Sequence, residues 1–416
     1  MTEQVKYRLM AQINKAFTPN RPIDSRSLFA GRTKQVEKLI SATSQRGSHA
    51  VLFGERGVGK TSLARTIFDF LVLAFDDASG YRHALLNSAE AMSFEDIWRA
   101  IFKQLTFEQS DGTTTTLDQA LAENPHSESV REVFSLVDYP TIIIVDEFDR
   151  IEDSDVRVKM ADTIKTLSDN AVRTTLILVG VADSVDELIG EHQSIERAIK
   201  QVPMPRMSKV ELLEIVDNGI SSCRGLTIQP EARERMADLA QGLPSYTHLL
   251  ARESALSAAR NERSQVTMND LECGIKESVD SQLGTSLTLY TKATTAARGI
   301  YFKPVLLACA LAPKDEKGFF YAKDIVAPLK AIIPNAPGIQ QFAQHLKDFS
   351  QTRGPILERD GRRYRFIKPL MGPYVILRGL ADGLIQESQL NRPSSSEPEQ
   401  LSLLSNVSAP PLELSP

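Results

Sequence analysis

The chain of 416 residues is long enough for two or three domains with hydrophobic cores of their own. Its 42% hydrophobic and 24% charged residues are typical of a globular protein, and the net charge of −5 excludes a polycation that coats nucleic acid with its whole surface. The three cysteines are far apart in no metal-ligand spacing, and the N-terminus lacks the apolar core of a signal peptide. We expect a cytoplasmic protein without membrane contact.

The N-terminal segment carries one helical pattern. Residues 3–16 place Val5, Leu9 and Ile13 on one face, which predicts an amphipathic helix that packs on the body of the protein. Pro19 and Pro22 then end the pattern, so residues 1–24 are interpreted as a helix and a lead-in.

A phosphate-binding pattern follows the apolar strand predicted at Ala50–Phe53. The pattern G-x-x-x-x-G-K-[ST] is matched by Gly54, Glu55, Arg56, Gly57, Val58, Gly59, Lys60 and Thr61, and Ser62 opens an apolar helix. Glycines let successive backbone N–H groups turn toward phosphate oxygens, and the helix N-terminus adds partial positive charge. Lys60 can reach the β- and γ-phosphates, and the Thr61 hydroxyl can ligate Mg²⁺. This stretch predicts a site for ATP and Mg²⁺.

Further strands alternate with helical segments along the next 150 or so residues. They are predicted at Arg82–Asn87, Thr141–Val145, Thr174–Val181 and near Gln201–Met204. This alternation predicts a doubly wound α/β domain, in which ligand binds beyond the carboxyl ends of parallel strands. Residues 107–127 are polar and are interpreted as a surface insertion without chemistry.

From Ser208 the pattern is helical, and about four helices are predicted to form a lid, with Gly242-Leu243-Pro244 between the second and the third. Three more helical segments follow, at Phe302–Leu311, Ala322–Leu329 and Ile339–Phe349. A hairpin comes next, with a two-residue loop predicted at Asp360-Gly361. Three helices before a hairpin is the order of a winged helix. The Ser/Pro/Glu-rich tail predicts disorder.

Two acids end the strand at 141–145. Asp146 can hold the water shell of Mg²⁺, and Glu147 can orient and polarise an attacking water. A P-loop kinase of small molecules does not normally need the second acid, so the pair favours hydrolysis of ATP.

These motifs together resemble an AAA+ ATPase over roughly residues 25–380, close to the origin-recognition initiators and to the STAND (NB-ARC-related) switch ATPases. The resemblance implies Walker A at 54–61 and Walker B at 142–147. It implies further nucleotide contacts from Arg32 in the entry motif, Asp183 at the sensor 1 place and Pro244 in the lid. It also implies Arg197 as an arginine finger acting from a neighbouring subunit, with Arg206 as a second candidate.

The chain departs from the initiator pattern at two places. Sensor 1 is usually Asn, whereas this chain has Asp183 followed by Ser184. The usual sensor 2 arginine is replaced by Ser245 or Tyr246, which together with Pro244 favours the STAND kind of lid.

The resulting prediction is a P-loop NTPase of the AAA+ kind with a doubly wound parallel sheet, a helical lid and a C-terminal winged-helix domain. The predicted segments are the N-terminal helix and lead-in (1–24), the AAA+ core (25–206), the lid (207–285), the winged helix (286–385) and the disordered tail (386–416).

Two kinds of partner stay open. Arg359, Arg362, Arg363 and Arg365 lie on the predicted wing and are candidate DNA contacts. In the alternative, a STAND-like signalling or defence switch, the winged helix is an internal clamp and the partner is an unknown protein. In both readings the ATP-bound chain is expected to form a homo-oligomer.

Overall fold

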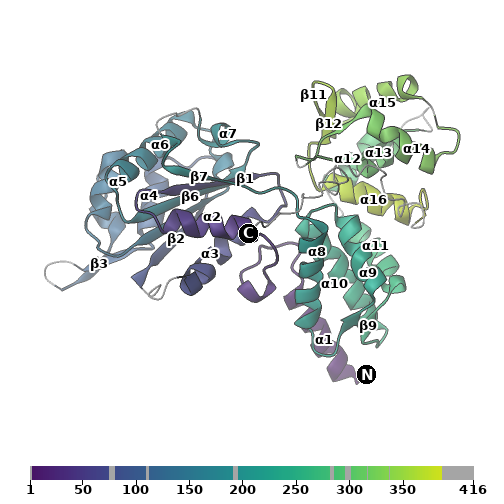
Figure 1. Cartoon of the computed structure of the whole chain (residues 1–416), viewed down its shortest axis with the longest axis horizontal. Coiled ribbons are helices and arrows are strands. Elements are labelled where there is room, and N and C mark those ends of the chain that lie inside the picture. The colour runs from purple at the N-terminus through teal and green to yellow at the C-terminus, as the bar shows by residue number, and fades with distance from the viewer. Residues whose placement is uncertain are drawn as a thin grey trace, which may run out of the picture.

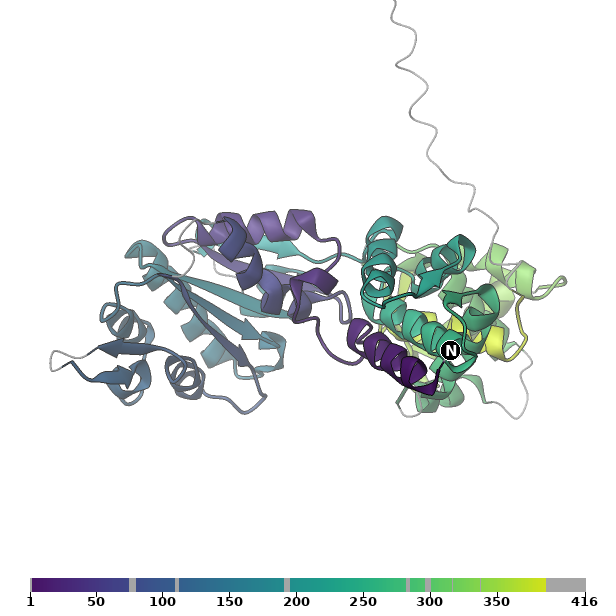
Figure 2. The same cartoon turned by 90° about the horizontal axis from the view of Figure 1, so that it is seen from below.

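The structure is a computed structural model that describes residues 2–74, 80–108, 112–190, 195–281, 285–295, 301–315, 317–336 and 338–386. Almost all of the predicted disordered tail, 387–416, lies outside these residues. Two lobes lie side by side, an α/β lobe and a helical lobe that begins after residue 206 (Figures 1 and 2). Among the described helices, none combines the length and the apolar character needed to cross a bilayer.

A parallel sheet of five strands in the order β2-β5-β6-β1-β7 forms the centre of the α/β lobe. Its strands, which confirm the predicted ones, are β1 (His49–Gly54), β2 (Arg82–Asn87), β5 (Thr141–Asp146), β6 (Thr174–Val181) and β7 (Ile199–Pro203). All six residues of β5 are buried, as predicted for a central strand.

Each face of the sheet has its own hydrophobic core, because side chains alternate along the strands. Leu52, Ile142 and Ile144 belong to one core, whereas Val51 and Ile143 belong to the other. The first core includes α2 (Thr33–Thr43) and α3 (Lys60–Ala74); the second includes α4 (Phe94–Phe102), α5 (Ser127–Phe134), α6 (Ser154–Asp169) and α7 (Val185–Ile189). The fold is therefore the expected doubly wound α/β fold.

The prediction of a polar surface insertion over 107–127 is wrong for part of that stretch. Strands β3 (Thr106–Glu108) and β4 (Thr114–Thr116) form an antiparallel pair, and the 3₁₀ helix η3 (Leu117–Ala120) follows. Leu117 and Leu121 are buried in the second core. Two leucines among many polar residues show no periodicity, so the sequence pattern did not reveal this packing.

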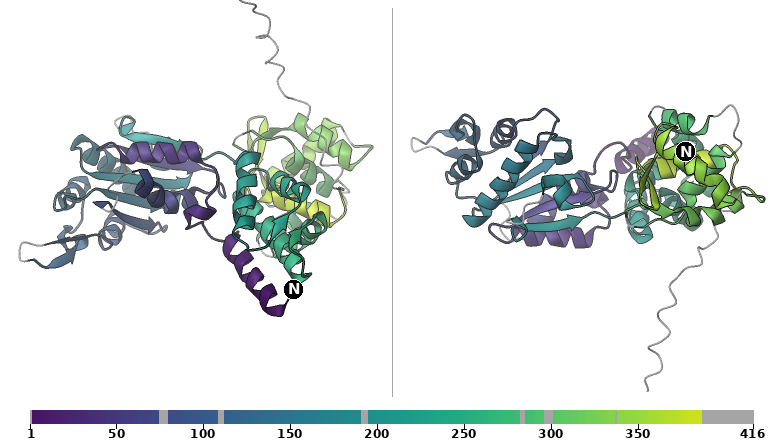
Figure 3. Two further views of the ribbon diagram at one scale, coloured as in Figure 1. Left: turned by 60° about the horizontal axis from the view of Figure 1, so that its bottom comes forward. Right: turned by 90° about the horizontal axis from the view of Figure 1, so that it is seen from above.

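The helical lobe opens with α8 (Lys209–Ser221), α9 (Pro230–Ala240), α10 (Pro244–Arg260) and α11 (Met268–Ser281), and β8 (Thr227–Ile228) pairs with β9 (Gln265–Val266). The expected capping box of Ser208 and Glu211 begins α8. The predicted N-terminal helix, α1 (Glu3–Ala16), packs on α8 and α10 rather than on the α/β lobe (Figure 3). Phe17 lies so close to Gly219 that a Cβ there would be 2.2 Å from its ring.

The C-terminal module, residues 285–386, completes the helical lobe. It contains α12 (Thr285–Thr294), α13 (Phe302–Leu311), β10 (Phe320–Tyr321), the 3₁₀ helix η6 (Ala322–Ile325), α14 (Val326–Ile332), α15 (Ile339–Gln351), β11 (Leu357–Asp360), β12 (Arg363–Phe366) and α16 (Met371–Ala381). Its sheet has the order β10-β12-β11.

The predicted hairpin exists, but its loop is shifted by one residue. Asp360 pairs with Arg363, so the loop is Gly361-Arg362 rather than Asp360-Gly361. Gly361 has a φ of 58°. A glycine with positive φ at the first loop position is typical of one of the two favoured two-residue turns, and this placement spares Asp360 the left-handed conformation.

Candidate functional site: a phosphate loop at the lobe boundary

The phosphate loop joins the end of β1 to the start of α3. Gly54, Gly57 and Gly59 have φ angles of 151°, 90° and 95°, a region that side chains rarely adopt. A Cβ on Gly54 would also lie 2.4 Å from the carbonyl oxygen of Met204. The glycines are therefore needed both for the curl of the backbone and for its close approach to the segment after β7.

Lys60 lies inside this loop. Its Nζ donates hydrogen bonds to the carbonyl oxygens of Gly54 and Glu55, each at 2.8 Å. Burial lowers the pKa of Lys60 to about 8, although Asp149, Asp146 and Glu55 act in the opposite direction. The amine is thus held at the wall of the site by the backbone of the loop itself.

Asp146 ends β5 and is 2% exposed. It accepts hydrogen bonds from the Thr61 side chain and from the backbone N–H of Glu147, the latter at 2.9 Å. Burial raises the pKa of the Asp146 carboxyl, and these hydrogen bonds oppose that shift. A buried carboxylate with a hydroxyl beside it is suited to a cation.

Glu147 points differently from Asp146. It adopts a left-handed backbone conformation with a φ of 55°, and its half-exposed carboxylate forms an ion pair with Arg150 at 2.9 Å. Sparsely populated backbone conformations of this kind are concentrated at functional sites. The two acids therefore occupy distinct positions, one buried beside Thr61 and one at the surface of the cavity.

A cavity of about 780 Å³ lies against the phosphate loop. Of the predicted site residues, it is lined by Arg32, Arg56, Gly57, Val58, Gly59, Lys60, Thr61, Ser62, Asp146, Glu147 and Pro244. Pro244, at the start of α10, lies 3.8 Å from the position of a Cβ on Gly59. Arg32 is buried and donates from Nη2 to the Val58 carbonyl at 2.7 Å, so it braces the loop.

Four predicted site residues do not line this cavity. Gly54 ends β1 and lies against Met204, and Glu55 forms an ion pair with Arg206. Asp183 forms an ion pair with Arg365 of the C-terminal module. Arg197 is exposed in the turn before β7. Arg206, the second candidate for a finger acting on a neighbouring subunit, faces the phosphate loop of its own chain.

Several lining residues were not predicted. Residues 18–23 of the lead-in form one wall, Ser245 and His248 of α10 another, and Leu370 of the C-terminal module lies over the loop. A Cβ on Gly57 would be 3.1 Å from Leu370 Cδ2, and the Tyr246 hydroxyl donates to the Leu370 carbonyl at 2.7 Å. Apart from Ser245, which the resemblance puts at the sensor 2 place, no local sequence signal marks these residues, because they join the site through tertiary packing.

The cavity has the features required to hold a nucleotide with a metal ion. Arg32 Nε, Ser245 Oγ and His248 Nδ1 are buried and have no hydrogen-bond partner among the described residues. No described group of three or more His, Cys, Asp and Glu side chains could hold a metal ion. The Asp146 carboxylate and the Thr61 hydroxyl are oxygen ligands of the kind that Mg²⁺ prefers. Mg²⁺ is usually bound by one or two protein ligands together with phosphate oxygens and water.

The strand order, the phosphate loop and the acid at the end of β5 define a P-loop NTPase fold of the AAA+ kind. Residues 43–189 match the family model described as AAA domain, so the chain contains an AAA domain over this segment.

Solved structures with a similar fold include the Walker-type ATPase of Pyrococcus abyssi, with 15% identity and a TM-score of 0.52, covering 86% of this chain and 99% of that one. They also include Cdc6p from Pyrobaculum aerophilum, with 16% identity and a TM-score of 0.44, covering 90% and 99% of the two chains. The Orc1 protein of Aeropyrum pernix in complex with DNA has 15% identity and a TM-score of 0.47, covering 89% and 96%. No curated protein matches the chain.

Proposed function

We propose that the chain is a cytoplasmic, Mg²⁺-dependent ATPase of the AAA+ group whose nucleotide state rearranges its lobes and drives self-assembly. The observation that carries the proposal is one cavity at which the phosphate loop, Asp146, the start of α10 and Leu370 of the C-terminal module meet. A ligand bound there contacts both lobes, so its phosphate content can alter how the lobes sit together.

In this proposal Lys60 and the loop N–H groups bind the phosphates, and Thr61 and Asp146 hold Mg²⁺. The metal ion, when bound, supplies charge neutralisation on the phosphate oxygens. Glu147 orients and polarises the attacking water from its separate position. The presence of this second acid also argues against a P-loop kinase of small molecules, which does not normally need it. Arg197 acts on the site of a neighbouring subunit, and its exposure supports that role. Arg32, Asp183 and Pro244 are proposed nucleotide contacts, Asp183 only after it leaves Arg365.

We further propose that residues 286–385 are a winged helix that contacts DNA through Arg359, Arg362, Arg363 and Arg365. The order α13, β10, α14, α15, β11, β12 supports the assignment. The alternative is a STAND-like switch that binds a protein and no DNA, and whose winged helix acts as an internal clamp. The position of Leu370 at the phosphate loop supports this alternative.

Nucleotide binding by the purified chain tests the central proposal. Wild type should bind fluorescent ATP in the presence of Mg²⁺, and Lys60→Ala should lose binding. Lys38→Ala, which changes an exposed lysine outside the cavity, is the matched control. Wild-type protein that neither binds nor hydrolyses ATP would refute the proposal.

Size-exclusion chromatography with and without duplex DNA distinguishes an initiator-like ATPase from a STAND-like switch. Each should form an oligomer with a slowly hydrolysed ATP analogue and not with ADP. An initiator-like protein should also bind duplex DNA, whereas a STAND-like switch should assemble without binding it.

A further inference from the structure

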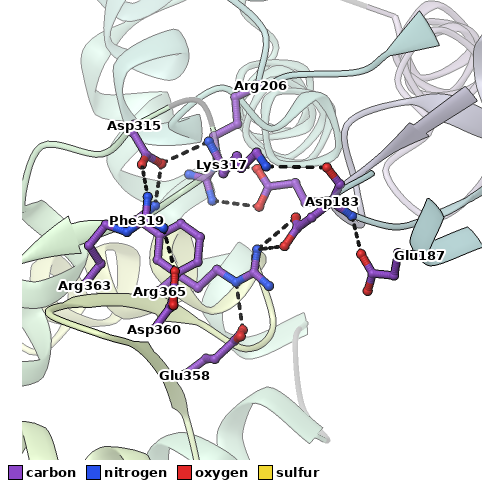
Figure 4. Close-up of polar contacts among 11 residues, drawn as sticks. Asp183, Glu187, Arg206, Asp315, Lys317, Phe319, Glu358, Asp360, Arg363 and Arg365 are labelled. Carbon is purple, nitrogen blue, oxygen red and sulfur yellow. Dashed lines mark hydrogen bonds and ion pairs between the residues drawn. The ribbon is translucent and has the colours of Figure 1, made fainter. Parts of the chain in front are cut away.

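A set of polar contacts joins the C-terminal module to the α/β lobe beside the phosphate loop (Figure 4). Arg365 Nη1 donates to both carboxylate oxygens of Asp183, at 3.0 and 2.9 Å, and its Nε donates to Glu358 at 2.8 Å. Lys317 Nζ also reaches the Asp183 carbonyl at 3.4 Å. Asp183 follows β6 in the α/β lobe, whereas its two basic partners belong to the C-terminal module.

The Asp183–Arg365 ion pair lies at the rim of this contact. The two side chains are 40% and 22% exposed, so water reaches both partners. Ion pairs with this exposure are weak, and breaking one changes an equilibrium constant by at most about fivefold. The ion pair can therefore orient the C-terminal module relative to the α/β lobe and still be broken by an anion that competes for Arg365.

Arg365 is one of four arginines on the β11–β12 hairpin. Residues 357–366 contain only two acids, Glu358 and Asp360, and Lys368 follows. In the folded chain Asp315 and Asp183 also pair with Arg363 and Arg365. Arg359 and Arg362 are exposed. A guanidinium group whose Nη1 contacts both oxygens of a carboxylate also suits a phosphate, and a two-stranded ribbon fits the major groove of duplex DNA. The hairpin thus has the charge and shape for a nucleic-acid backbone.

We propose that Arg365 binds either Asp183 or a DNA phosphate, so that DNA binding and the closed arrangement of the lobes exclude each other. The inference rests on the proposed DNA contact of the hairpin and adds its regulation. Because the same module places Leu370 over the phosphate loop, DNA that captures Arg365 also withdraws a wall of the nucleotide cavity. By linkage, a ligand that favours the closed arrangement weakens DNA binding by the same factor by which DNA weakens the binding of that ligand.

Two substitutions break the same ion pair and should have opposite effects on DNA binding. Asp183→Asn frees Arg365, so the affinity for a labelled duplex of random sequence should rise about twofold to fivefold, the range expected for a weak ion pair. Arg365→Ala removes a phosphate contact, so affinity should fall and the slope of log affinity against log salt should become shallower by ~0.9. Arg365→Lys should retain most of the slope. Fluorescence anisotropy of the full chain without nucleotide measures all of these.

Asp186→Asn is the matched control, because it removes an equal charge from an exposed acid three residues further on. The Asp186 side chain has no hydrogen bond or ion pair with any described residue. Asp186→Asn should change affinity by less than Asp183→Asn. Equal effects of the two Asn variants, or weaker DNA binding by Asp183→Asn, would refute the proposal that Asp183 and DNA compete for Arg365. Neither result would contradict the DNA contact of the hairpin. Absence of binding by every variant would refute both, whereas the ATP-binding test of Lys60→Ala is independent of this outcome.

Discussion

The ion pair between Glu55 and Arg206 should be a principal stabilising contact of the phosphate loop. Arg206 Nε and Nη2 donate to the two carboxylate oxygens of Glu55, and Nη1 donates to the Gln241 carbonyl at 3.2 Å. Both partners are only 13% exposed. Gly318 of the C-terminal module lies over the pair, since a Cβ there would be 3.1 Å from Arg206 Nη2.

Arg206→Met should destabilise the α/β lobe because it leaves the Glu55 carboxylate enclosed without its partner. Loss of one member of a fully buried pair costs about 3–5 kcal/mol, and the residual exposure here places the expected loss of unfolding free energy at about 2–3 kcal/mol. Glu55→Gln should cost about 2 kcal/mol, since a neutral amide leaves the guanidinium group partly unpaired. The double variant should cost little more than either single change.

Urea unfolding followed by tryptophan fluorescence suits this measurement, because Trp98 is the single tryptophan and is buried in the α/β lobe. Lys209→Met is the control: its partners Glu234 and Asp238 are 47% and 44% exposed, so its cost should stay under about 1 kcal/mol. A coupling energy between Glu55 and Arg206 below about 0.5 kcal/mol would mean that the pair is not a stabilising unit, and the reasoning would be refuted.

Three further outcomes are expected. Glu147→Gln should bind ATP but hydrolyse it about 100-fold or more slowly in single-turnover phosphate release, the usual contribution of a positioned base, and an unchanged rate would remove Glu147 from this role. Burial lowers the pKa of Lys314 to about 7, so between pH 7 and about 10.5 the folded chain binds fewer protons than the unfolded chain and its stability should rise with pH. Lys314→Met should flatten this rise in thermal unfolding measured across that pH range. Equal pH profiles of the variant and the wild type would contradict the prediction. Phe17→Ala should cost about 3 kcal/mol and speed amide exchange in α1, because the buried ring packs on Gly219, whereas unchanged protection would show that α1 does not depend on Phe17.

The elements that the sequence predicts well are those with a strong local signal. The strand Thr141–Val145 is apolar and β-branched throughout, and Ser208 with Glu211 has the spacing of a capping box. In contrast, α16 was not predicted: it contains Pro373 and is buried on almost every side, so it shows no helical alternation of polar and apolar residues. Strand β10 is only two residues long, and it is recognised as a strand by its pairing with β12 rather than by a pattern in its own sequence.

The candidate site divides in the same way. Residues 54–62, Asp146 and Glu147 carry their chemistry in contiguous motifs, and the structure brings most of them to one cavity. Leu370 enters that cavity from more than 300 residues along the chain, and a leucine has no motif that would indicate this. Asp183 also lies where the resemblance places it, after β6, and its carboxylate contacts Arg365 of the C-terminal module.

The charge of the hairpin shows why a sequence count misjudges a surface. Counted along the chain, its four arginines are a strongly basic cluster. In the folded chain Arg363 forms ion pairs with Asp360 and with Asp315, and Arg365 with Glu358 and Asp183, so two of the acids that neutralise the hairpin come from outside it. An asparagine at 183, the usual sensor 1 residue, accepts a hydrogen bond but carries no charge to balance a guanidinium group. If Arg365 alternates between Asp183 and DNA as proposed, the charge of Asp183, where the initiator pattern has Asn, is also what holds Arg365 in the closed arrangement.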